Sequence, residues 1–363
     1  MDSSDSNSQG RIHMARNKKF AALFATVALL VTGAGVASQA QAADTLNVYA
    51  ALDYSTDVIK AFTAKTGIQV NLTALSTGPL LAKIQAEKNN PQWGVYWADG
   101  AEPCAAMDID KQLLHYSPTL GHQLTLVGKK LTPTSHAYNV PGFTEMVGVV
   151  YNAAKVAKPT SFQDLLTPAY KNQVGMNNPS ISGPTYPFIA GLMAQLGGED
   201  AGKTYLTALK ANGLVVNAKN GPTLHALEVG TINVALVQSS AAINEVNTFK
   251  AKPVAGFQPQ VTFLSKTTLL PSCIAIDAHV PAQTKAAKAF VDFVMSDAGQ
   301  DVMKTGAPGG DSLFFPSMLS RTAVPAVTAS TPTMASGIVQ VVDPYTWGPL
   351  QGEIDDWFTK NIA

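Results

Sequence analysis

The sequence contains few charged residues, and this shortage limits the partners that the protein can have. Charged residues make up 14% of the 363 residues, and the 25 basic and 25 acidic side chains balance. The sequence has no basic run or patch of the kind that binds nucleic acid or a membrane surface. Low-complexity segments and internal repeats are also absent. We therefore expect no nucleic-acid partner.

Local catalytic motifs are missing as well. The histidines at positions 115, 122, 136, 225 and 279 are scattered and form no H-E-x-x-H pattern, and C-x-x-C does not occur. The segment nearest to a G-x-S-x-G nucleophile motif, residues 180–183, lacks the first glycine. An exported hydrolase needs a nucleophile with a base, or a metal cluster. An enzyme is therefore the less favoured class, and we expect neither a cofactor nor a bound metal.

The first 42 residues have the pattern of a polar leader and a secretion signal. A short basic stretch precedes an apolar run over residues 20–37 that glycines interrupt. Residues 40–42 form an A-x-A cleavage site, which predicts export to the periplasm and a mature chain that begins at Ala43. No cysteine follows this site, so no lipid anchor is expected. The mature chain keeps 21 basic and 23 acidic residues, a net charge of −2.

The sequence contains two cysteines, Cys104 and Cys273. The first is expected at the start of a helix, and the second in the apolar strand of residues 272–276. An oxidising compartment permits a disulfide between them. Two buried, unpaired thiols are equally compatible with the sequence, because the sequence does not supply the geometry of the pair. Both alternatives stay open.

Residues 45–100 alternate between strands and helices, and the rest of the chain is organised around them. Short apolar strands are expected at residues 46–49, 69–72 and 95–97, with amphipathic helices after the first two. Such an α/β alternation forms a parallel sheet with right-handed crossovers, so the loops after the strands emerge at one edge. We expect a ligand crevice at that edge.

Several helix starts carry hydroxyl or amide groups that would face this crevice. A serine or glycine ahead of a proline leaves backbone N–H groups and the positive end of a helix aimed at one point, which suits a phosphate, phosphonate or carboxylate. An ordinary N-cap is the alternative for each start taken alone, and the repetition favours anion binding. The residues assigned to this role are Ser76, Thr77, Gly78, Ser182, Gly183, Thr185, Asn220, Gln238 and Ser239.

Three segments of the chain resemble a known family. Residues 46–49 (LNVY), 62–70 (FTAKTGIQV) and 76–87 (STGPLLAKIQAE) look like the start of the ferric-binding-type solute-binding proteins of bacterial ABC importers. That family includes receptors for aminoethylphosphonate and for sugar phosphates. The resemblance implies a periplasmic-binding-protein type II fold, in which two doubly wound α/β lobes are joined by a two-strand hinge. It also implies a monomer that delivers a small solute to an inner-membrane ABC permease.

In this resemblance the chain leaves the first lobe along a strand over residues 146–152 and returns along residues 269–276. The expected parts are residues 43–148 with 266–320 for the first lobe, 149–265 for the second lobe, and 321–363 for a C-terminal helical segment that docks on the second lobe. Hinge closure around the ligand is the expected motion.

The sequence departs from the iron-carrying relatives at their metal ligands. Where those relatives have two adjacent tyrosines, residues 238–241 read Gln, Ser, Ser and Ala, and Asp53 and Asp99 replace a histidine and a glutamate. Fe³⁺ prefers anionic oxygen ligands, and two carboxylates without phenolates are a poor set. Ferric binding is therefore an alternative of lower rank.

Asp53 and Asp99 each follow a strand of the first lobe, which suggests a different ligand. They would present negative charge to the crevice while the second lobe accepts an anion. A zwitterion such as 2-aminoethylphosphonate satisfies both walls. A sugar phosphate is the close alternative, because aspartates also accept hydrogen bonds from hydroxyl groups, and each aspartate could instead cap a helix. Tyr54, Trp97 and Tyr186 are candidates for an apolar wall, with a place in the core as the alternative.

Overall fold

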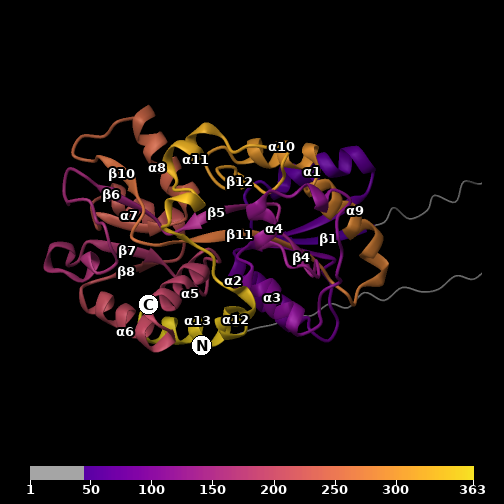
Figure 1. Ribbon diagram of the computed structural model, residues 1–363, viewed down its shortest axis with the longest axis horizontal. Helices are drawn as coiled ribbons and strands as arrows, with labels where there is room; N and C mark the ends of the chain where they lie inside the picture. The colour runs from indigo at the N-terminus through magenta and orange to yellow at the C-terminus, as the bar shows by residue number, and fades with distance from the viewer. Residues whose placement is uncertain (1–44) are drawn as a thin grey trace, which may run out of the picture. The chain divides into compact units, whose positions relative to one another are not determined.

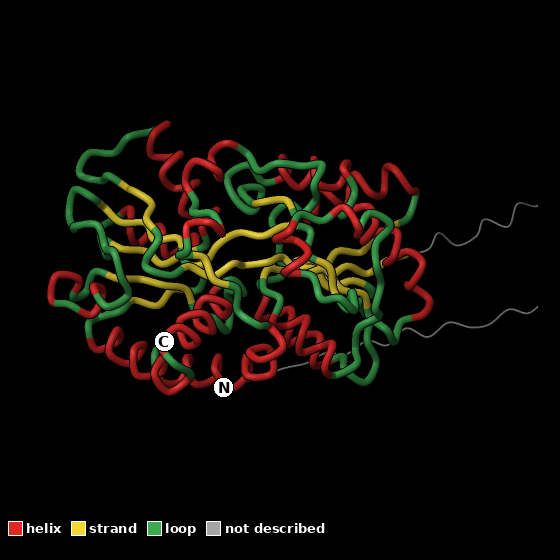
Figure 2. Tube along the Cα trace, viewed as in Figure 1, coloured by secondary structure: helices red, strands yellow, loops and turns green. Residues whose placement is uncertain are grey.

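The computed structural model describes residues 45–363, in which the strands form two sheets with helices on both sides (Figures 1 and 2). The predicted secretion signal and its cleavage site lie outside the described residues. None of the described helices combines the length and the apolar character needed to cross a membrane. The mixed architecture confirms the predicted α/β class.

The first sheet is built from the alternating region of the sequence. β1 (Thr45–Ala50) lies between β2 (Gln69–Ala74) and β3 (Val95–Asp99) and pairs with both in parallel. The connecting helices are α1 (Ser55–Thr66) and α2 (Thr77–Ala86). Because the strands are parallel, the loops that follow them emerge at the same edge, as the sequence predicts.

Side chains on β1 and β3 alternate between the two faces of this sheet. Val48 and Trp97 belong to the core formed with α1 and α9 (Thr284–Val294). Tyr49 belongs to a separate core formed with α2 and α3 (Glu102–Ile109). Helices therefore cover both faces of the sheet, which is the doubly wound arrangement.

Two crossings connect the first sheet with the second. β11 (Thr267–Ile276) runs antiparallel between β3 and β5 (Gly142–Met146). The chain passes from β5 to β6 (Gly148–Asn152) in the second sheet, and it returns from β10 (Pro259–Thr262) to β11. These crossings form the two-strand hinge. The first crossing is two strands separated by one residue, where the sequence predicts one continuous strand.

The second sheet has the strand order β10-β6-β9-β7-β8. Its remaining strands are β7 (Val174–Asn177), β8 (Val215–Asn217) and β9 (Val234–Val237). Its helices are α5 (Thr185–Leu196), α6 (Glu199–Ala211), α7 (Asn220–Glu228) and α8 (Ser239–Ala251). β7 pairs in parallel with β8 and β9, so the segments after these strands also share one edge.

The C-terminal helix α13 (Gln351–Asn361) packs on the second lobe, because Ile354 and Phe358 lie in the same core as Leu192 and Tyr205. The other elements are β4 (Tyr138–Asn139), β12 (Phe315–Pro316), β13 (Val339–Gln340), α4 (Leu126–Leu131), α10 (Asp297–Gly306), α11 (Pro325–Ser330) and α12 (Pro344–Trp347), with short 3-10 helices at Gly121–Gln123, Asp164–Leu166, Pro168–Tyr170, Pro281–Gln283, Met334–Ser336 and Gly348–Leu350.

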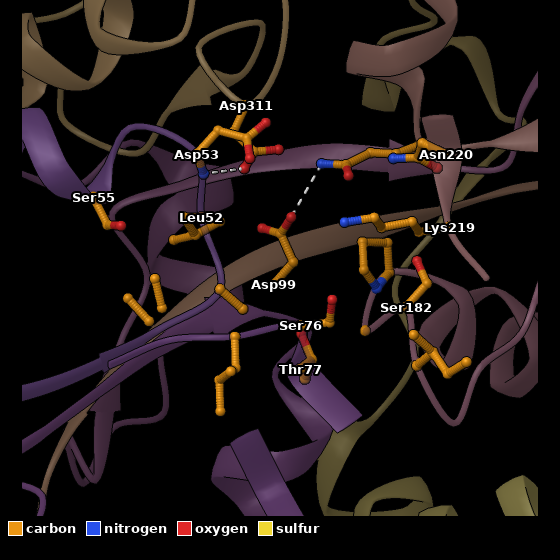
Figure 3. A pocket seen from close by; sticks show the side chains of 18 of the residues that line it. Leu52, Asp53, Ser55, Ser76, Thr77, Asp99, Ser182, Lys219, Asn220 and Asp311 are labelled. Atoms are coloured by element: carbon orange, nitrogen blue, oxygen red, sulfur yellow. Dashed lines mark hydrogen bonds between the residues drawn. The ribbon is translucent and has the colours of Figure 1, made fainter. Parts of the chain in front are cut away.

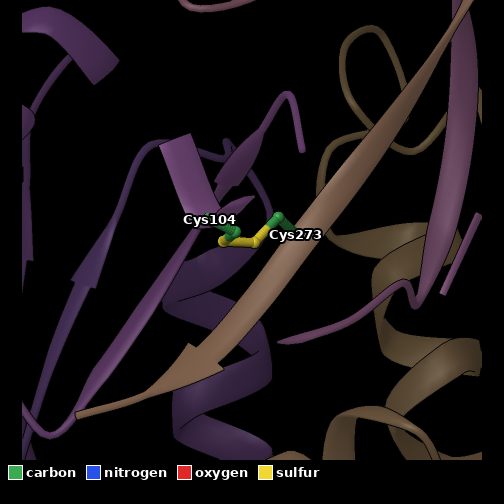
Figure 4. Close-up of a disulfide and its surroundings, with 2 residues drawn as sticks. All are labelled: Cys104 and Cys273. Atoms are coloured by element: carbon green, nitrogen blue, oxygen red, sulfur yellow. A yellow bond between two sulfur atoms is a disulfide. The ribbon is translucent and has the colours of Figure 1, made fainter. Parts of the chain in front are cut away.

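A disulfide joins Cys104 in α3 to Cys273 in β11 (Figure 4). Both residues are fully buried, and their Cα atoms are 6.6 Å apart. Of the two alternatives that the sequence leaves open, the structure has the bonded pair. The bond fixes α3, which follows the site strand β3, to the strand that forms half of the hinge.

We predict that this disulfide stabilises the protein substantially, because it closes a loop with a sequence separation of 169 residues. Replacing both Cys104 and Cys273 by alanine should lower the free energy of unfolding by about 2–4 kcal/mol. Denaturant titration of the two proteins, with and without a reductant, measures this loss. The reductant should destabilise only the wild type. Two reactive thiols in the denatured, unreduced wild type would contradict the prediction.

Candidate functional site

A cleft of about 540 Å³ lies between the lobes, at the edge where the strands of the first sheet end (Figure 3). The loops after β1, β2 and β3 form one wall, and the segments that open α5, α7 and α8 form the other. Eight of the eleven predicted binding residues line it: Asp53, Ser76, Thr77, Asp99, Ser182, Gly183, Asn220 and Gln238. Their contacts with a solute stay a prediction.

Three aspartates lie on the wall of the first lobe. Asp53 follows β1, Asp99 is the last residue of β3, and Asp311 comes from the glycine-rich loop after α10. The Asp311 carboxylate accepts a hydrogen bond of 2.8 Å from the backbone N–H of Asp53 (Figure 3). Sequence reasoning missed Asp311, because nothing local links residue 311 to strands more than 200 positions earlier. The two glycines at positions 309 and 310 were the sequence feature that could have pointed to this loop.

Burial and mutual repulsion favour the neutral forms of two of these carboxyl groups, those of Asp99 and Asp311. Burial, followed by the charge of Asp311, raises the pKa of Asp99 well above its usual range, against a hydrogen bond of 3.1 Å from Gln238 Nε2. Burial, followed by the charge of Asp53, raises the pKa of Asp311 to about 7. A cation bound between these groups would favour their ionised forms. The wall is therefore suited to a positively charged ligand group.

Neither Asp53 nor Asp99 caps a helix, which was the alternative role for both. The N-cap of α1 is Tyr54 and the N-cap of α3 is Ala101, and neither helix start has a side-chain cap hydrogen bond. Asp53 and Asp99 thus lie in the cleft without the capping role that would explain them structurally.

The opposite wall is organised by the buried residue Asn177 at the end of β7. Its Nδ2 donates to Asn220 Oδ1 at 2.7 Å and to Ser182 Oγ at 3.4 Å, while its Oδ1 accepts from Thr223 Oγ1 at 2.7 Å. Asn220 Oδ1 is therefore occupied, and the amide NH₂ is the group that Asn220 offers to the cleft. Hydrogen-bond donors and helix N-termini on this wall suit an anion.

Lys219 adds a full positive charge to this wall. It is the N-cap residue of α7, and its side chain extends into the cleft toward the aspartates (Figure 3). The residues predicted from the sequence include the neighbouring Asn220 but not Lys219. The two walls therefore carry opposite charge, with Asp53, Asp99 and Asp311 facing Lys219 and the helix starts.

Three predicted residues have other positions. Gly78 contacts the second lobe at Ser180, and Ser239 Oγ accepts the backbone N–H of Glu145 at the hinge. Thr185 is buried in the first turn of α5 and does not line the cleft. The two aromatic candidates Trp97 and Tyr186 are fully buried core residues, so an apolar wall made by them is wrong. Tyr54 is buried against Trp97 and Phe314.

The lobes touch each other across the cleft. The backbone N–H of Gly78 in α2 donates to the carbonyl oxygen of Ile181 at 3.4 Å. Gln238 from the second lobe also donates to Thr144 Oγ1 at 3.2 Å. A Cβ on Gly78 would lie 1.8 Å from the carbonyl oxygen of Ser180. Glycine lowers helix stability, and this close approach explains its presence in α2.

Among residues 45–363, no group of three or more histidine, cysteine, aspartate or glutamate side chains is arranged to hold a metal ion. The three aspartates of the cleft share a wall without forming such a cluster.

A hinged pair of α/β lobes with a charged cleft between them defines a solute-binding protein. The chain belongs to the family of bacterial extracellular solute-binding proteins, whose pattern matches residues 57–332. Proteins of this class capture solutes in the periplasm for an ABC importer and its membrane permease. The family and the fold are those of binding proteins and not of enzymes.

Two relatives cover most of the chain. An uncharacterized protein of Haemophilus influenzae is 26% identical over 294 residues, which is 77% of this chain and 81% of that protein. A protein of Salmonella typhimurium, provisionally named a 2-aminoethylphosphonate-binding periplasmic protein, is 25% identical over 243 residues, or 66% of this chain and 68% of that one.

Solved structures share the fold. The periplasmic binding protein AfuA of Actinobacillus pleuropneumoniae, with fructose-6-phosphate bound, has a TM-score of 0.73 at 21% identity, covering 88% of this chain and 98% of that one. Iron-bound HitA of Pseudomonas aeruginosa has a TM-score of 0.68 at 20% identity, covering 86% of this chain and 98% of that one. The predicted type II fold is thereby confirmed.

We predict that Gly78→Ala prevents full closure, because the added Cβ would collide with the backbone at Ser180. Solute affinity should fall by about tenfold or more, while helix α2 itself gains stability. Calorimetric titration measures the affinity, and small-angle scattering with solute measures the degree of closure. Gly352→Ala is the matched control, because a Cβ there meets nothing within 4 Å. Unchanged affinity in Gly78→Ala would show that this contact is not part of the bound state.

We also predict that Asp311 makes the stability of the ligand-free protein depend on pH. Its folded pKa of about 7 lies above that of an unfolded chain, so the folded state holds the proton more tightly and loses stability as the pH rises through this interval. Between about pH 5 and about pH 8 the free energy of unfolding of the ligand-free wild type should fall by about 1–3 kcal/mol more than that of Asp311→Asn. Denaturant titration at both pH values tests this, with the exposed Asp200→Asn as control. Equal losses in wild type and Asp311→Asn would refute the assignment.

Proposed function

We propose that this protein is the periplasmic receptor for 2-aminoethylphosphonate, captured by hinge closure and delivered to an ABC permease. The observation that carries the proposal is the division of charge in one cleft. Three aspartates line the wall of the first lobe, whereas Lys219 and the helix starts with Ser182 and Asn220 line the other. A short molecule with an ammonium group and a phosphonate group is complementary to both walls.

The ammonium end is assigned to the aspartates by electrostatics. Burial raises the pKa of Asp99 and of Asp311, so the empty wall retains protons that a cationic group would displace. An anionic group at this wall would add repulsion to groups that are already difficult to ionise. The cation therefore has one favourable position in the cleft.

The phosphonate end is assigned to the second lobe. Backbone N–H groups in the first turn of a helix have no partner within the helix, and the helix dipole adds positive potential there. The segments that open α5 and α7 both line the cleft. Lys219 adds a positive charge, and its ammonium group can donate hydrogen bonds to the phosphonate oxygens. Buried Asn177 holds Ser182 and Asn220 in position.

Binding drives closure by a shift of population. A ligand that touches both lobes only in the closed state stabilises that state by the difference in contact. Gln238 takes part in this step, since it reaches from the second lobe to Asp99 and Thr144. The Salmonella typhimurium relative, provisionally named for the same ligand, supports the proposal.

A sugar phosphate is the second candidate, favoured by the fold shared with AfuA, whose structure holds fructose-6-phosphate. Such a ligand offers hydroxyl groups to the aspartates and no cation. Ferric ion ranks lower, because residues 238–241 carry no tyrosine and the described aspartates form no metal cluster. An exported hydrolase ranks lowest, and phosphonate turnover by the purified protein would revive it.

The experiment is a calorimetric titration of ligand-stripped protein with 2-aminoethylphosphonate in the presence of a chelator. We expect saturable one-to-one binding without turnover. Ethylphosphonate, which lacks the amine, should bind at least about tenfold more weakly, as should the variants Asp99→Asn and Lys219→Met toward the full ligand. Asp200→Asn, on the exposed start of α6, should bind as the wild type does.

Two results would contradict the proposal. Binding of ethylphosphonate as tight as that of 2-aminoethylphosphonate would remove the role of the aspartates. Tight binding of fructose-6-phosphate or of ferric ion without chelator, with no heat from 2-aminoethylphosphonate, would assign the cleft to the alternative ligand.

A further inference from the structure

Four consecutive residues ahead of α5 line the ligand cleft on the wall to which the phosphonate is assigned. We call residues 181–184 the anion segment. Two of its amides donate within the same loop, from Ile181 and Ser182 to the carbonyl oxygen of Asn178 at 3.2 and 2.9 Å. A binding group has to be held to within about 0.5 Å, and a loop achieves this only through contacts with rigid elements around it.

One such contact lies immediately before the anion segment. The Oγ of Ser180 donates to the carbonyl oxygen of Asp355 at 3.2 Å, and it lies 2.7 Å from Oγ1 of Thr359. Because a serine hydroxyl has one proton, the hydroxyl of Thr359 is the donor in the second bond. Both partners belong to α13, at 175 and 179 positions further along the chain. Ser180 therefore connects the anion segment to the C-terminal helix.

A second contact lies two residues after the anion segment. The hydroxyl of Tyr186, in the first turn of α5, donates to the carbonyl oxygen of Trp347 at 2.5 Å. Tyr186 is fully buried, so water does not compete for this bond. The sequence suggested an apolar wall of the cleft as its role, and the structure instead gives its hydroxyl group a partner at the end of α12.

Both contacts lead to the same part of the chain, residues 344–361, which we call the tail segment. Its helix α13 is fixed to the second lobe through Ile354 and Phe358 in the core. Its other end packs on the first lobe, because a Cβ on Gly348 would lie 2.4 Å from the carbonyl oxygen of Glu102 at the start of α3. Figure 1 shows α12 beside α3. The tail segment thus extends from the anion segment to the helix that follows Asp99.

We propose that Ser180 and Tyr186 are positioning residues, through which the tail segment holds the anion segment at the place where it meets the phosphonate. Neither residue lines the cleft, so neither touches the solute. They act on Ser182 and Gly183, which lie between them. The inference rests on the proposed function, because it takes the anion of the solute to bind at this wall. It makes a helix at the far end of the chain part of solute recognition.

The test measures affinity in variants that remove one hydroxyl group each. Ser180→Ala and Tyr186→Phe should each weaken 2-aminoethylphosphonate by at least about threefold in calorimetric titration, because a fixed hydrogen bond is lost on one side of the anion segment. Ethylammonium, which lacks the anion, should bind the wild type and both variants equally, as measured by its NMR shift at the amide of Gly100. A general loss of structure would weaken both compounds.

A double-mutant cycle tests the connection to α13. Thr359→Val should weaken 2-aminoethylphosphonate less than Ser180→Ala does, because Ser180 keeps its bond to the carbonyl oxygen of Asp355. Added to Ser180→Ala, the Thr359 change should have no further effect. Thr207→Val is the matched control, since Thr207 is exposed on α6 of the same lobe and its hydroxyl donates within its own helix.

Hydrogen exchange in the ligand-free protein supplies a readout that needs no solute. The amides of Ser182 and Thr185 donate to Asn178 and Ser182 at 2.9 and 3.0 Å. Their exchange should be faster by about threefold or more in Ser180→Ala and Tyr186→Phe, and unchanged in Thr207→Val. Absence of 2-aminoethylphosphonate binding by the wild type would count against the proposed function, and the exchange rates would still judge the positioning role.

Two results would overturn the inference. One is wild-type exchange at the Ser182 and Thr185 amides in both single variants. The other is an equal loss of affinity for 2-aminoethylphosphonate and for ethylammonium, because that pattern would assign Ser180 and Tyr186 to stability alone.

Discussion

The central physical constraint is the placement of three aspartates on one partly desolvated wall. Burial and mutual repulsion raise the pKa of Asp99 and of Asp311, so an empty closed cleft is electrostatically unfavourable unless protons or a cation compensate. The parallel sheet brings Asp53 and Asp99 together because β1 and β3 are neighbours that end at one edge. The loop after α10 then adds Asp311 from a distant part of the chain.

The second lobe provides the complement to this wall. Its own strands end at a shared edge, where Asn177 orders Ser182 and Asn220, and Lys219 opens α7. The hinge between β5 and β6 and between β10 and β11 lets the two walls meet. Gly78 permits the contact between α2 and the segment before α5, and the disulfide fixes α3 to the hinge strand. Charge recognition and closure therefore depend on the same few contacts.

Local patterns in the sequence predicted much of this arrangement. Apolar periodicity and the order of strands and helices gave the first sheet, and the polar residues after each strand placed eight residues in the cleft. Two of the residues that were missed depend on long-range contacts, because Asp311 reaches the cleft from a loop and Asn177 acts through side chains on two other segments. Gly78 was predicted as a binding residue, and its contact with the second lobe is explained only by the position of Ser180. The pairing of Cys104 with Cys273 likewise required the geometry of the fold. The residue limits drawn for the lobes stay a proposal.

The most direct test of the account is a crystal structure of the protein with 2-aminoethylphosphonate bound. The account predicts the ammonium nitrogen within hydrogen-bond distance of the Asp99 and Asp311 carboxylates. It places the phosphonate oxygens against Ser182, Lys219 and the start of α7. A ligand in the reverse orientation, or one held by a single lobe only, would contradict the claim that opposed charge on the two walls selects the solute.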